Sequence, residues 1–295
     1  MTRQTLSYVR RRLEGAGIRP DTRKGQNFLV DLNLIDFLVR AARLTDRDVV
    51  LEVGTGTGSL TTRLADVAAH VVTVELDARL FELSGGILSE RTNVTRMHGD
   101  VLQNKNRLAS DVLEAVNGVL EAGRRFKLVA NLPYGVATPV ISNLLVGPLV
   151  PQRMVVTVQK EVADRMAARP GTKDYGALSV WVQSLCRVDV LRVLPPSVFW
   201  PRPKVDSAIV EIEPVPAKRA AIGDVTFFHQ FVRRIFWHRR KYLRSVMLGA
   251  YKGQLDKRAV DAILGERGLA PDARAEQLDL DAMRELCQTI AERLS

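Results

Sequence analysis

The sequence predicts an α/β fold: a mostly parallel, Rossmann-like sheet whose last strand is antiparallel, followed by a small all-helical C-terminal domain. The apolar run at 49–53 stops at a glycine-rich turn at 54–58, and a helical pattern follows at 60–65. This is the strand, turn and helix that open a doubly wound sheet. Further short apolar runs alternate with helical patterns, and the chain after residue 219 contains helical patterns rich in basic residues.

The remaining elements follow from the same periodicities. We expect an exposed helix at 5–14 and a second helix capped by Asp31, whose carboxylate can accept hydrogen bonds from the first free amides. Segment 24–29 is too polar and irregular for a core strand, whereas 104–125 is helical in period. The other expected helices lie at 77–88, 161–168 and 177–185, and the other expected strands at 70–75, 93–97, 126–130, 154–158, 188–193 and 208–212.

Length and composition suggest how the chain is divided. With 295 residues, it can form one large core and one small one. We expect a helical arm at 1–24, a ligand-binding sheet domain at 25–214 and a helical basic domain at 219–295. A linker rich in small residues and proline is expected at 214–218. The arm has several arginines but lacks the apolar segment of a secretory signal.

The charge of the chain points to a polyanionic partner. The net charge is +10 and the isoelectric point about 9.9, which favours nucleic acid over the rival partner, an anionic membrane surface. No apolar run approaches the ~20 residues that span a bilayer. Cys186 and Cys287 are far apart and lack metal-ligand spacing, which suits a reducing cytoplasm.

The glycine-rich turn has the form Glu52-x-Gly54-x-Gly56-x-Gly58. A dinucleotide fingerprint would require glycine at position 59, which is Ser59. The observed form is typical of enzymes that bind S-adenosylmethionine (SAM). The next strand ends at Glu75, about 20 residues beyond the first glycine, where a carboxylate can accept hydrogen bonds from both ribose hydroxyls. The alternative is an ordinary strand with a surface glutamate.

Two further strand ends carry polar or aromatic residues. Asp100 follows the strand at 93–97, in the crevice where such sheets bind ligands. The strand at 126–130 runs into Asn131-Leu132-Pro133-Tyr134. Proline stiffens this loop, so that an amide and an aromatic face are presented together. The alternative is a plain turn.

The segment 227–247 is expected to form an amphipathic helix. No acidic residue occurs between Phe227 and Tyr251, which favours a phosphate-contacting surface over an ordinary solvated face. The expected apolar stripe contains Phe228, Phe231, Val232, Ile235, Tyr242 and Val246, and the basic face contains Arg233, Arg240, Lys241 and Arg244.

These motifs together resemble the rRNA adenine dimethyltransferases of the KsgA/Erm type, almost from end to end. Within that family, the basic run at 236–244 is similar to the housekeeping KsgA branch. The chain departs from the usual pattern at Thr55, where proline is common, at Gly135, where asparagine is common, and at Tyr242, where threonine is common. The motifs that carry the resemblance are at 25–29, 52–58, 75, 99–100, 131–134 and 199–207.

The resemblance implies a SAM-dependent methyltransferase, without a metal, that dimethylates N6 of two adjacent adenosines near the 3′ end of small-subunit (16S) rRNA. The implied partner is a 30S pre-ribosomal particle, with no membrane partner, and the protein is expected to be a cytoplasmic monomer. Implied cofactor contacts are Gln26, Asn27, Leu29, Gly54, Gly56, Glu75, Leu76, Asp100, Val101 and Asn131. Implied catalytic residues are Asn131, Leu132, Pro133, Tyr134 and Phe199, with Tyr134 and Phe199 stacking on the target base, and implied RNA contacts are Arg233, Arg239, Arg240, Lys241 and Arg244.

Three alternatives stay open from the sequence. One is an Erm-type enzyme that methylates 23S rRNA and confers macrolide resistance. Another is a ribosome-assembly or transcription factor that keeps the fold as a nucleic-acid-binding module without catalysis, against which the intact Asn131–Tyr134 motif argues. The third is a SAM enzyme for a small molecule, which the basic helical segment disfavours.

Overall fold

The computed structural model describes residues 6–21 and 25–294, so part of the expected arm at 1–24 lies outside the described residues. The chain forms two compact units. The sheet unit comprises Met1–Ala163 and Asp189–Glu213, and the helical unit comprises Asp164–Val188 and Pro214–Ser295. The division expected from the sequence had placed 164–188 with the sheet. Within the described part of the chain, none of the helices is both long and apolar enough to cross a membrane.

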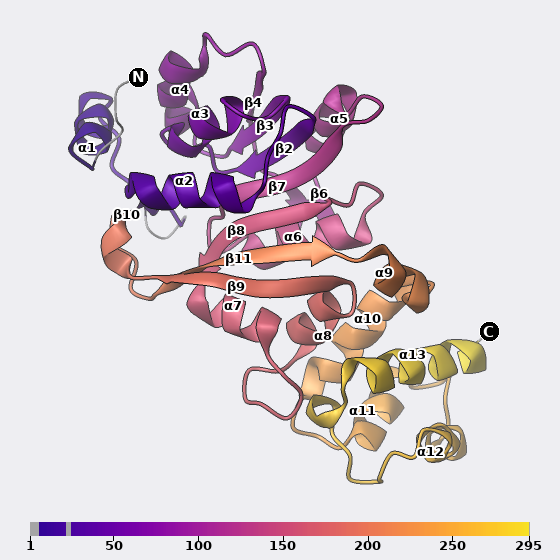
Figure 1. Ribbon diagram of the computed structural model, residues 1–295. Helices are drawn as coiled ribbons and strands as arrows, with labels where there is room; N and C mark the ends of the chain where they lie inside the picture. The colour runs from indigo at the N-terminus through magenta and orange to yellow at the C-terminus, as the bar shows by residue number, and fades with distance from the viewer. Residues whose placement is uncertain (1–5, 22–24, 295) are drawn as a thin grey trace. The chain divides into compact units, whose positions relative to one another are not determined.

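The central sheet has seven strands in the order β4-β3-β2-β7-β8-β11-β9 (Figure 1). Strands β4, β3, β2, β7 and β8 are mutually parallel, and β11 pairs antiparallel with β8. The predicted mostly parallel sheet with an antiparallel closing strand is therefore confirmed. The strand bounds are β2 (Asp48–Val53), β3 (His70–Glu75), β4 (Val94–His98), β7 (Arg125–Asn131), β8 (Arg153–Gln159), β9 (Cys186–Leu194) and β11 (Ser207–Pro214).

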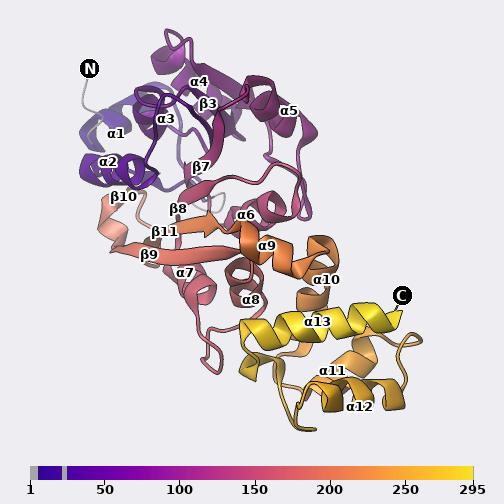
Figure 2. The same cartoon turned by 45° about the vertical axis from the view of Figure 1, so that its right-hand side comes forward.

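Helices cover both faces of the sheet, as Figure 2 shows with α2 and α3 on one side of the strands and α5 and α6 on the other. The predicted Asp31 cap is confirmed, since its carboxylate accepts hydrogen bonds from the amides of Asn33 and Leu34 at the start of α2. In the sheet unit the helices are α1 (Leu6–Gly15), α2 (Leu32–Ala41), α3 (Ser59–Ala65), α4 (Ala78–Leu88), α5 (Ser110–Val119) and α6 (Ala137–Val146), with α7 (Lys160–Ala167) at its boundary.

The core on one face of the sheet joins α2 and α3 to strands that are far apart in sequence. Leu34, Ile35 and Leu38 of α2 and Leu60 and Leu64 of α3 pack with strand residues in one cluster. Strand side chains alternate between faces, and each of five strands contributes one side chain to this cluster. Those strand residues are Val50, Val71, Val129, Val155 and Ile209. This packing holds the carboxyl ends of the central strands side by side.

Two predictions about the sheet unit were wrong. Helix α1 is not wholly exposed, because Val9 and Leu13 pack with Ile18, Phe28 and Leu80. Segment 104–125 is helical only in α5, since β5 (Leu102–Asn104) and β6 (Arg107–Leu108) form a two-stranded sheet before it. The expectation that the segment at 24–29 supplies no core strand agrees with the described part of that segment, because its short strand β1 (Phe28–Leu29) pairs antiparallel with β10 (Phe199–Trp200) in a separate two-stranded sheet.

The helical unit corrects two further predictions. The expected linker at 214–218 runs into α9, which begins at Pro216 because proline is tolerated in a first helical turn. The expected helix at 227–247 is interrupted: α10 ends at Ile235, the 3-10 helix η3 (Phe236–His238) follows, and α11 begins at Leu243. The helices of this unit are α8 (Ala177–Gln183), α9 (Pro216–Ile222), α10 (Val225–Ile235), α11 (Leu243–Ala250), α12 (Lys257–Glu266) and α13 (Leu280–Leu294).

Candidate active site

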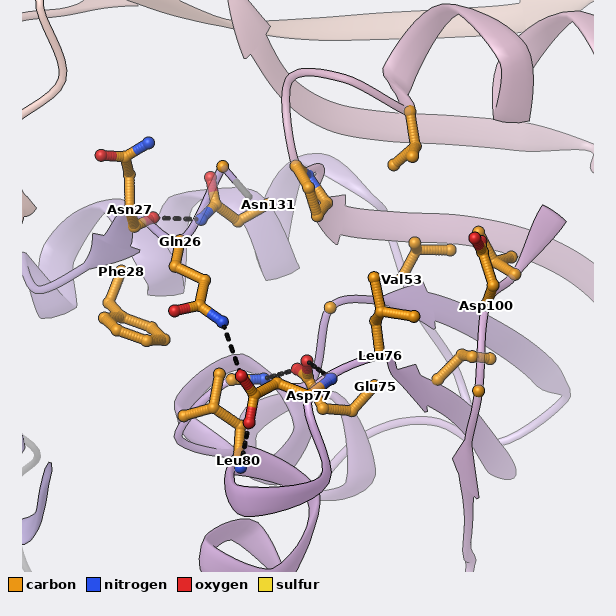
Figure 3. Close-up of a pocket in the computed structure, with 18 residues that line it drawn as sticks. Gln26, Asn27, Phe28, Val53, Glu75, Leu76, Asp77, Leu80, Asp100 and Asn131 are labelled. Carbon is orange, nitrogen blue, oxygen red and sulfur yellow. Dashed lines mark hydrogen bonds between the residues drawn. The ribbon is translucent and has the colours of Figure 1, made fainter. Parts of the chain in front are cut away.

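A pocket in the sheet unit lies where β2, β3, β4 and β7 end (Figure 3). The segment at 25–28 and the loop at 131–136 form its other walls. Backbone amides and carbonyls that leave a sheet edge are free to meet a ligand, so this crevice is the usual ligand site of open α/β sheets. It gathers the predicted residues Gln26, Asn27, Gly54, Gly56, Glu75, Leu76, Asp100, Val101, Asn131 and Pro133.

The glycine turn leaves space that side chains would fill. Gly54 and Gly56 have φ angles of 87° and 54°, a region that favours glycine. A Cβ on Gly56 would lie 3.2 Å from the ring of Phe28, and a Cβ on Gly54 would lie 3.4 Å from Pro133. The turn can therefore follow this path, with its backbone close to the pocket, only while these two positions lack side chains.

Glu75 is fixed at the pocket by two backbone amides. One carboxylate oxygen accepts a hydrogen bond from the Gly56 amide at 2.8 Å and the other from the Asp77 amide at 2.9 Å. Burial raises the pKa of this carboxyl above its usual value, and the amide hydrogen bonds oppose the rise. Each oxygen keeps a lone pair for a further donor, which is the geometry that two adjacent hydroxyls require.

Glu52 lies beneath the turn in a buried network of hydroxyls. Its carboxyl accepts hydrogen bonds from Thr61 at 2.6 Å and Thr73 at 2.7 Å. A hydroxyl has one proton, so Thr55, which lies 2.6 Å from the Thr73 hydroxyl, donates to it. Burial raises the pKa of Glu52 to about 8, against the hydrogen bonds from Thr61 and Thr73. This network connects the turn to α3 and β3.

The segment before β1 is held at the pocket through Gln26. Its side-chain nitrogen donates to Asp77 at 3.2 Å (Figure 3), and its side-chain oxygen accepts the Asp21 amide at 2.7 Å. Asp77 also caps α4. The neighbouring Asn27 is buried, and its side-chain oxygen has no hydrogen-bond partner in the described part of the chain. That oxygen is therefore available to a ligand donor.

Asn131 is the last residue of β7, and the nitrogen of its side-chain amide already has a hydrogen-bond partner. Its side-chain nitrogen donates to the Asn27 carbonyl at 3.0 Å (Figure 3). With the nitrogen held in this way, the side-chain oxygen is oriented as an acceptor. Leu132 is buried, and its amide donates to the Thr157 carbonyl at 3.2 Å, so the backbone beside Asn131 is also fixed.

The two predicted stacking residues have different environments. Tyr134 is partly exposed, and its hydroxyl lies 2.7 Å from the Ser207 hydroxyl. Burial raises the pKa of this phenol, so the ring remains neutral. Phe199 is only 2% exposed and belongs to the core cluster, where it is the β10 partner of Leu29. The expected second stacking face is therefore not accessible in this structure, because the β1–β10 pair buries the ring.

The other predicted contacts lie at the rim or behind the turn. Leu76 is 59% exposed and Asp100 is exposed at the mouth of the pocket, whereas Val101 is buried. One Asp100 oxygen accepts the Leu102 amide at 2.9 Å, so the other can accept a donor. Leu29 lines a small adjoining cavity with Glu52. Among residues 6–21 and 25–294, no group of three or more His, Cys, Asp and Glu side chains is placed to hold a metal ion.

Sequence reasoning assigned no role in the site to several residues that build it. Phe28 and Asp77 line the pocket, and Thr73 and Ser207 fix Glu52 and Tyr134. Thr73 carries a usable signal, since a hydroxyl inside an otherwise apolar strand requires a buried partner. Ser207 lies in the motif at 199–207 that carries the family resemblance, but that motif does not indicate its partner, which is 73 residues away in the chain.

The predicted RNA contacts of the helical unit fall into two groups. Arg244 forms a two-bond ion pair with Asp261 at 2.5 and 2.8 Å. Arg239 bonds Glu276 at 2.6 Å and the carbonyls of Thr172 and Lys173. Both side chains are thus engaged within the unit. Arg233, Arg240 and Lys241 differ from these two in exposure, because their side chains are exposed to solvent.

Sheet order, strand-end pocket and glycine turn together define a Rossmann-like methyltransferase. Solved structures agree. A dimethyladenosine transferase from Plasmodium falciparum matches with a TM-score of 0.73 at 24% identity, covering 89% of this chain and 97% of that one. The 23S rRNA methyltransferase ErmE matches with a TM-score of 0.61 at 25% identity, covering 90% of this chain and 100% of that one.

The sequence comparisons identify the family. The model of the family "Ribosomal RNA adenine dimethylase" matches residues 19–292, and the chain belongs to that family. It is 39% identical over 271 residues to ribosomal RNA small subunit methyltransferase A of Halothermothrix orenii, covering 92% of this chain and 88% of the relative. The protein of the same name from Bacillus cereus is 39% identical over 267 residues, covering 90% and 89%.

Proposed function

We propose that this protein transfers methyl groups from SAM to N6 of two adjacent adenosines near the 3′ end of small-subunit rRNA, dimethylating each during ribosome biogenesis. The arrangement at the end of β7 supports the reaction most directly. The Asn131 side-chain oxygen and the Leu132 carbonyl can accept the two N–H groups of an adenine amine. The names of the 39%-identical relatives support the small subunit as the substrate.

The residues of the pocket fit SAM. The paired acceptors of Glu75 suit the two ribose hydroxyls, and the free oxygen of Asp100 suits the adenine amine. Leu76 and Val101 offer apolar contacts for the adenine ring. The unpartnered Asn27 oxygen and the side-chain-free turn at Gly54 and Gly56 suit the ammonium and carboxylate of the methionine end. Leu29 and Gln26 hold this wall in place.

Catalysis in this proposal depends on positioning. When bound, SAM supplies a methyl group on a good leaving group. Asn131 and Leu132 hold the adenine amine so that its lone pair points at that methyl, and such alignment is worth roughly 7–11 kcal/mol in ideal cases. Tyr134 stacks on the target base once it has left its helix, which offsets about 1–3 kcal/mol of the unstacking cost. Pro133 stiffens the loop that carries these groups.

Methyl transfer to purified ribosomal subunits tests the proposal. Labelled SAM is supplied with 30S or 50S particles from an unmethylated strain, and the nucleosides are then analysed. We expect label on 30S as N6,N6-dimethyladenosine. Label on 50S alone would support the 23S activity of the Erm type, and intact SAM binding without label on either particle would support a non-catalytic RNA-binding role.

A further inference from the structure

A groove in the helical unit presents cations and the ring of Trp237 to solvent, and the ring of Tyr242 borders it at Arg274. It is lined by Lys173, Trp237, His238, Arg240, Lys241 and Arg274, together with the Arg239–Glu276 pair. Trp237 is 77% exposed. Exposure of a whole indole costs hydrophobic free energy, so its position invites a functional explanation.

The backbone that carries Trp237 is anchored on both sides. Phe236 packs edge-on against the buried ring of Tyr175, with ring centroids 6.2 Å apart, and the Tyr175 hydroxyl donates to the Leu278 carbonyl at 2.8 Å. Arg239 holds Glu276 and the carbonyls at 172–173. Because Phe236 and Arg239 are fixed by these contacts, Trp237 is presented to solvent without a loop having to order first.

A second aromatic ring borders the same cations. Tyr242 is 49% exposed and forms an isolated antiparallel bridge with Arg274, whose guanidinium lies 5.7 Å from the ring centroid. Among the residues that the structure describes, the only carboxylate that lines the groove is Glu276, which is paired with Arg239. Arg240 and Lys241 have no side-chain ion pair or hydrogen bond within residues 6–21 and 25–294. The groove therefore carries uncompensated positive charge beside the two rings.

We infer that this groove binds an unpaired stretch of the rRNA substrate, with a base stacked on Trp237 and the flanking phosphates on Arg240 and Lys241. Exposed aromatic faces serve bases that are not already stacked in a helix, and cations beside them follow the backbone. The identification of the bound nucleic acid as rRNA rests on the proposed function. A membrane surface fits less well, because the apolar stripe of α10 is buried and a membrane-binding helix would expose it.

Arg239 has a different role in this inference. It is a positioning residue that holds the platform under Trp237, whereas Arg240 and Lys241 contact phosphate. In this inference Arg244, whose guanidinium is paired with Asp261, makes no contact with the RNA. Within the basic run at 236–244, phosphate contact is therefore assigned to Arg240 and Lys241. Base stacking is assigned to Trp237, for which the sequence pattern had predicted no role.

Binding of oligouridine by the full chain tests the groove. Oligouridine contains no adenine, so it does not place a target base in the catalytic pocket. Single-stranded oligouridine and a blunt RNA duplex are titrated by fluorescence anisotropy against wild type, Trp237→Ala, Trp237→Phe and the control Lys252→Ala. Lys252 is exposed and lies outside the groove. Trp237→Ala should weaken oligouridine binding by roughly 5- to 150-fold and leave duplex binding within about twofold, and Trp237→Phe should restore part of the loss.

Intrinsic fluorescence provides a readout that does not depend on affinity. Oligouridine should quench wild-type fluorescence, and the quenching should disappear in Trp237→Phe, which retains Trp181 and Trp200. Equal losses for single strand and duplex, or unchanged binding and quenching, would overturn the inference. If the protein instead binds preferentially to vesicles containing phosphatidylglycerol, and Trp237→Ala loses this binding, the partner of the groove is a membrane surface and the inference is overturned. Methylation of 30S particles by wild type tests the proposed function separately, because it does not depend on oligouridine.

Discussion

The strand-end pocket and the basic groove are built on opposite principles. In the pocket, backbone groups and buried side chains face the ligand, as where Glu75 is fixed by two amides and Asn131 by the Asn27 carbonyl. In the groove, exposed side chains face the partner and the buried contacts lie beneath them. The comparison suggests that the pocket requires fixed geometry for bond making, whereas the groove requires charge and aromatic surface that tolerate many sequences.

The largest expected effect concerns Tyr134. Tyr134→Ala should lower methyl transfer to 30S particles by about 100-fold or more, because a poorly placed base loses alignment, while the SAM dissociation constant stays within about twofold. Tyr134→Phe keeps the ring and removes the hydrogen bond to Ser207, so its loss should stay below about 10-fold. Wild-type rates for Tyr134→Ala would remove the stacking role and weaken the contrast between pocket and groove.

The next effect concerns Glu75 and SAM affinity. Glu75→Gln should weaken SAM binding by roughly 10- to 150-fold by calorimetry, because a charged acceptor is lost and the new amide faces a backbone donor. Asp100→Asn, at an exposed rim position, should weaken it less. Since burial raises the Glu75 pKa, wild-type affinity should fall on acidification at a higher pH than for an ordinary glutamate. Equal affinities for wild type and Glu75→Gln would exclude the ribose role.

A smaller effect concerns stability and pH. The pKa of Glu52 is raised from 4.5 to about 8 in the folded state, so between these pH values the folded protein holds a proton that the unfolded chain has lost. The free energy of unfolding should therefore fall as pH rises through this window, by up to about 1.4 kcal/mol per pH unit.

The Glu52→Gln variant removes the contribution of Glu52 to the pH dependence of the free energy of unfolding. It should flatten the pH dependence in urea titrations between pH 5 and 8, a range taken from the raised pKa of Glu52, because its amide stays neutral. The exposed Glu90→Gln serves as the control and should match wild type. A Glu52→Gln slope equal to that of wild type would show that Glu52 is ionised in the folded protein.

The smallest effect compares neighbouring basic residues. Arg240→Ala combined with Lys241→Ala should lower the slope of log affinity against log salt for RNA by about 2 and leave stability unchanged. Arg239→Ala should instead cost on the order of 1–3 kcal/mol of stability, because Glu276 and two carbonyls lose their donor. The reverse pattern would mean that Arg239 contacts phosphate and that the groove is organised differently.

Much of the sheet and pocket could be predicted because their signals are local. A β-branched run that ends at alternating glycines, an acid at the end of β3 and Asn131 at the end of β7 each depend on one segment. Parallel strand ends then bring these segments to one edge by topology alone. The helical unit was harder, since the stripe at 227–247 continues in sequence while the backbone turns at η3, which lets Arg239 reach Glu276 and leaves Trp237 exposed.

The sequence alone determined the fold class, the SAM-type turn and the strand ends that carry Glu75, Asp100 and Asn131, because periodicity and spacing encode them within short windows. Only the tertiary structure decided which predicted residues are available. Phe199 is covered through the β1–β10 pair, while Arg239 and Arg244 are taken up by Glu276 and Asp261. Burial and pairing depend on residues distant in the chain, so side chains that look alike in sequence acquire different roles once their partners are in place.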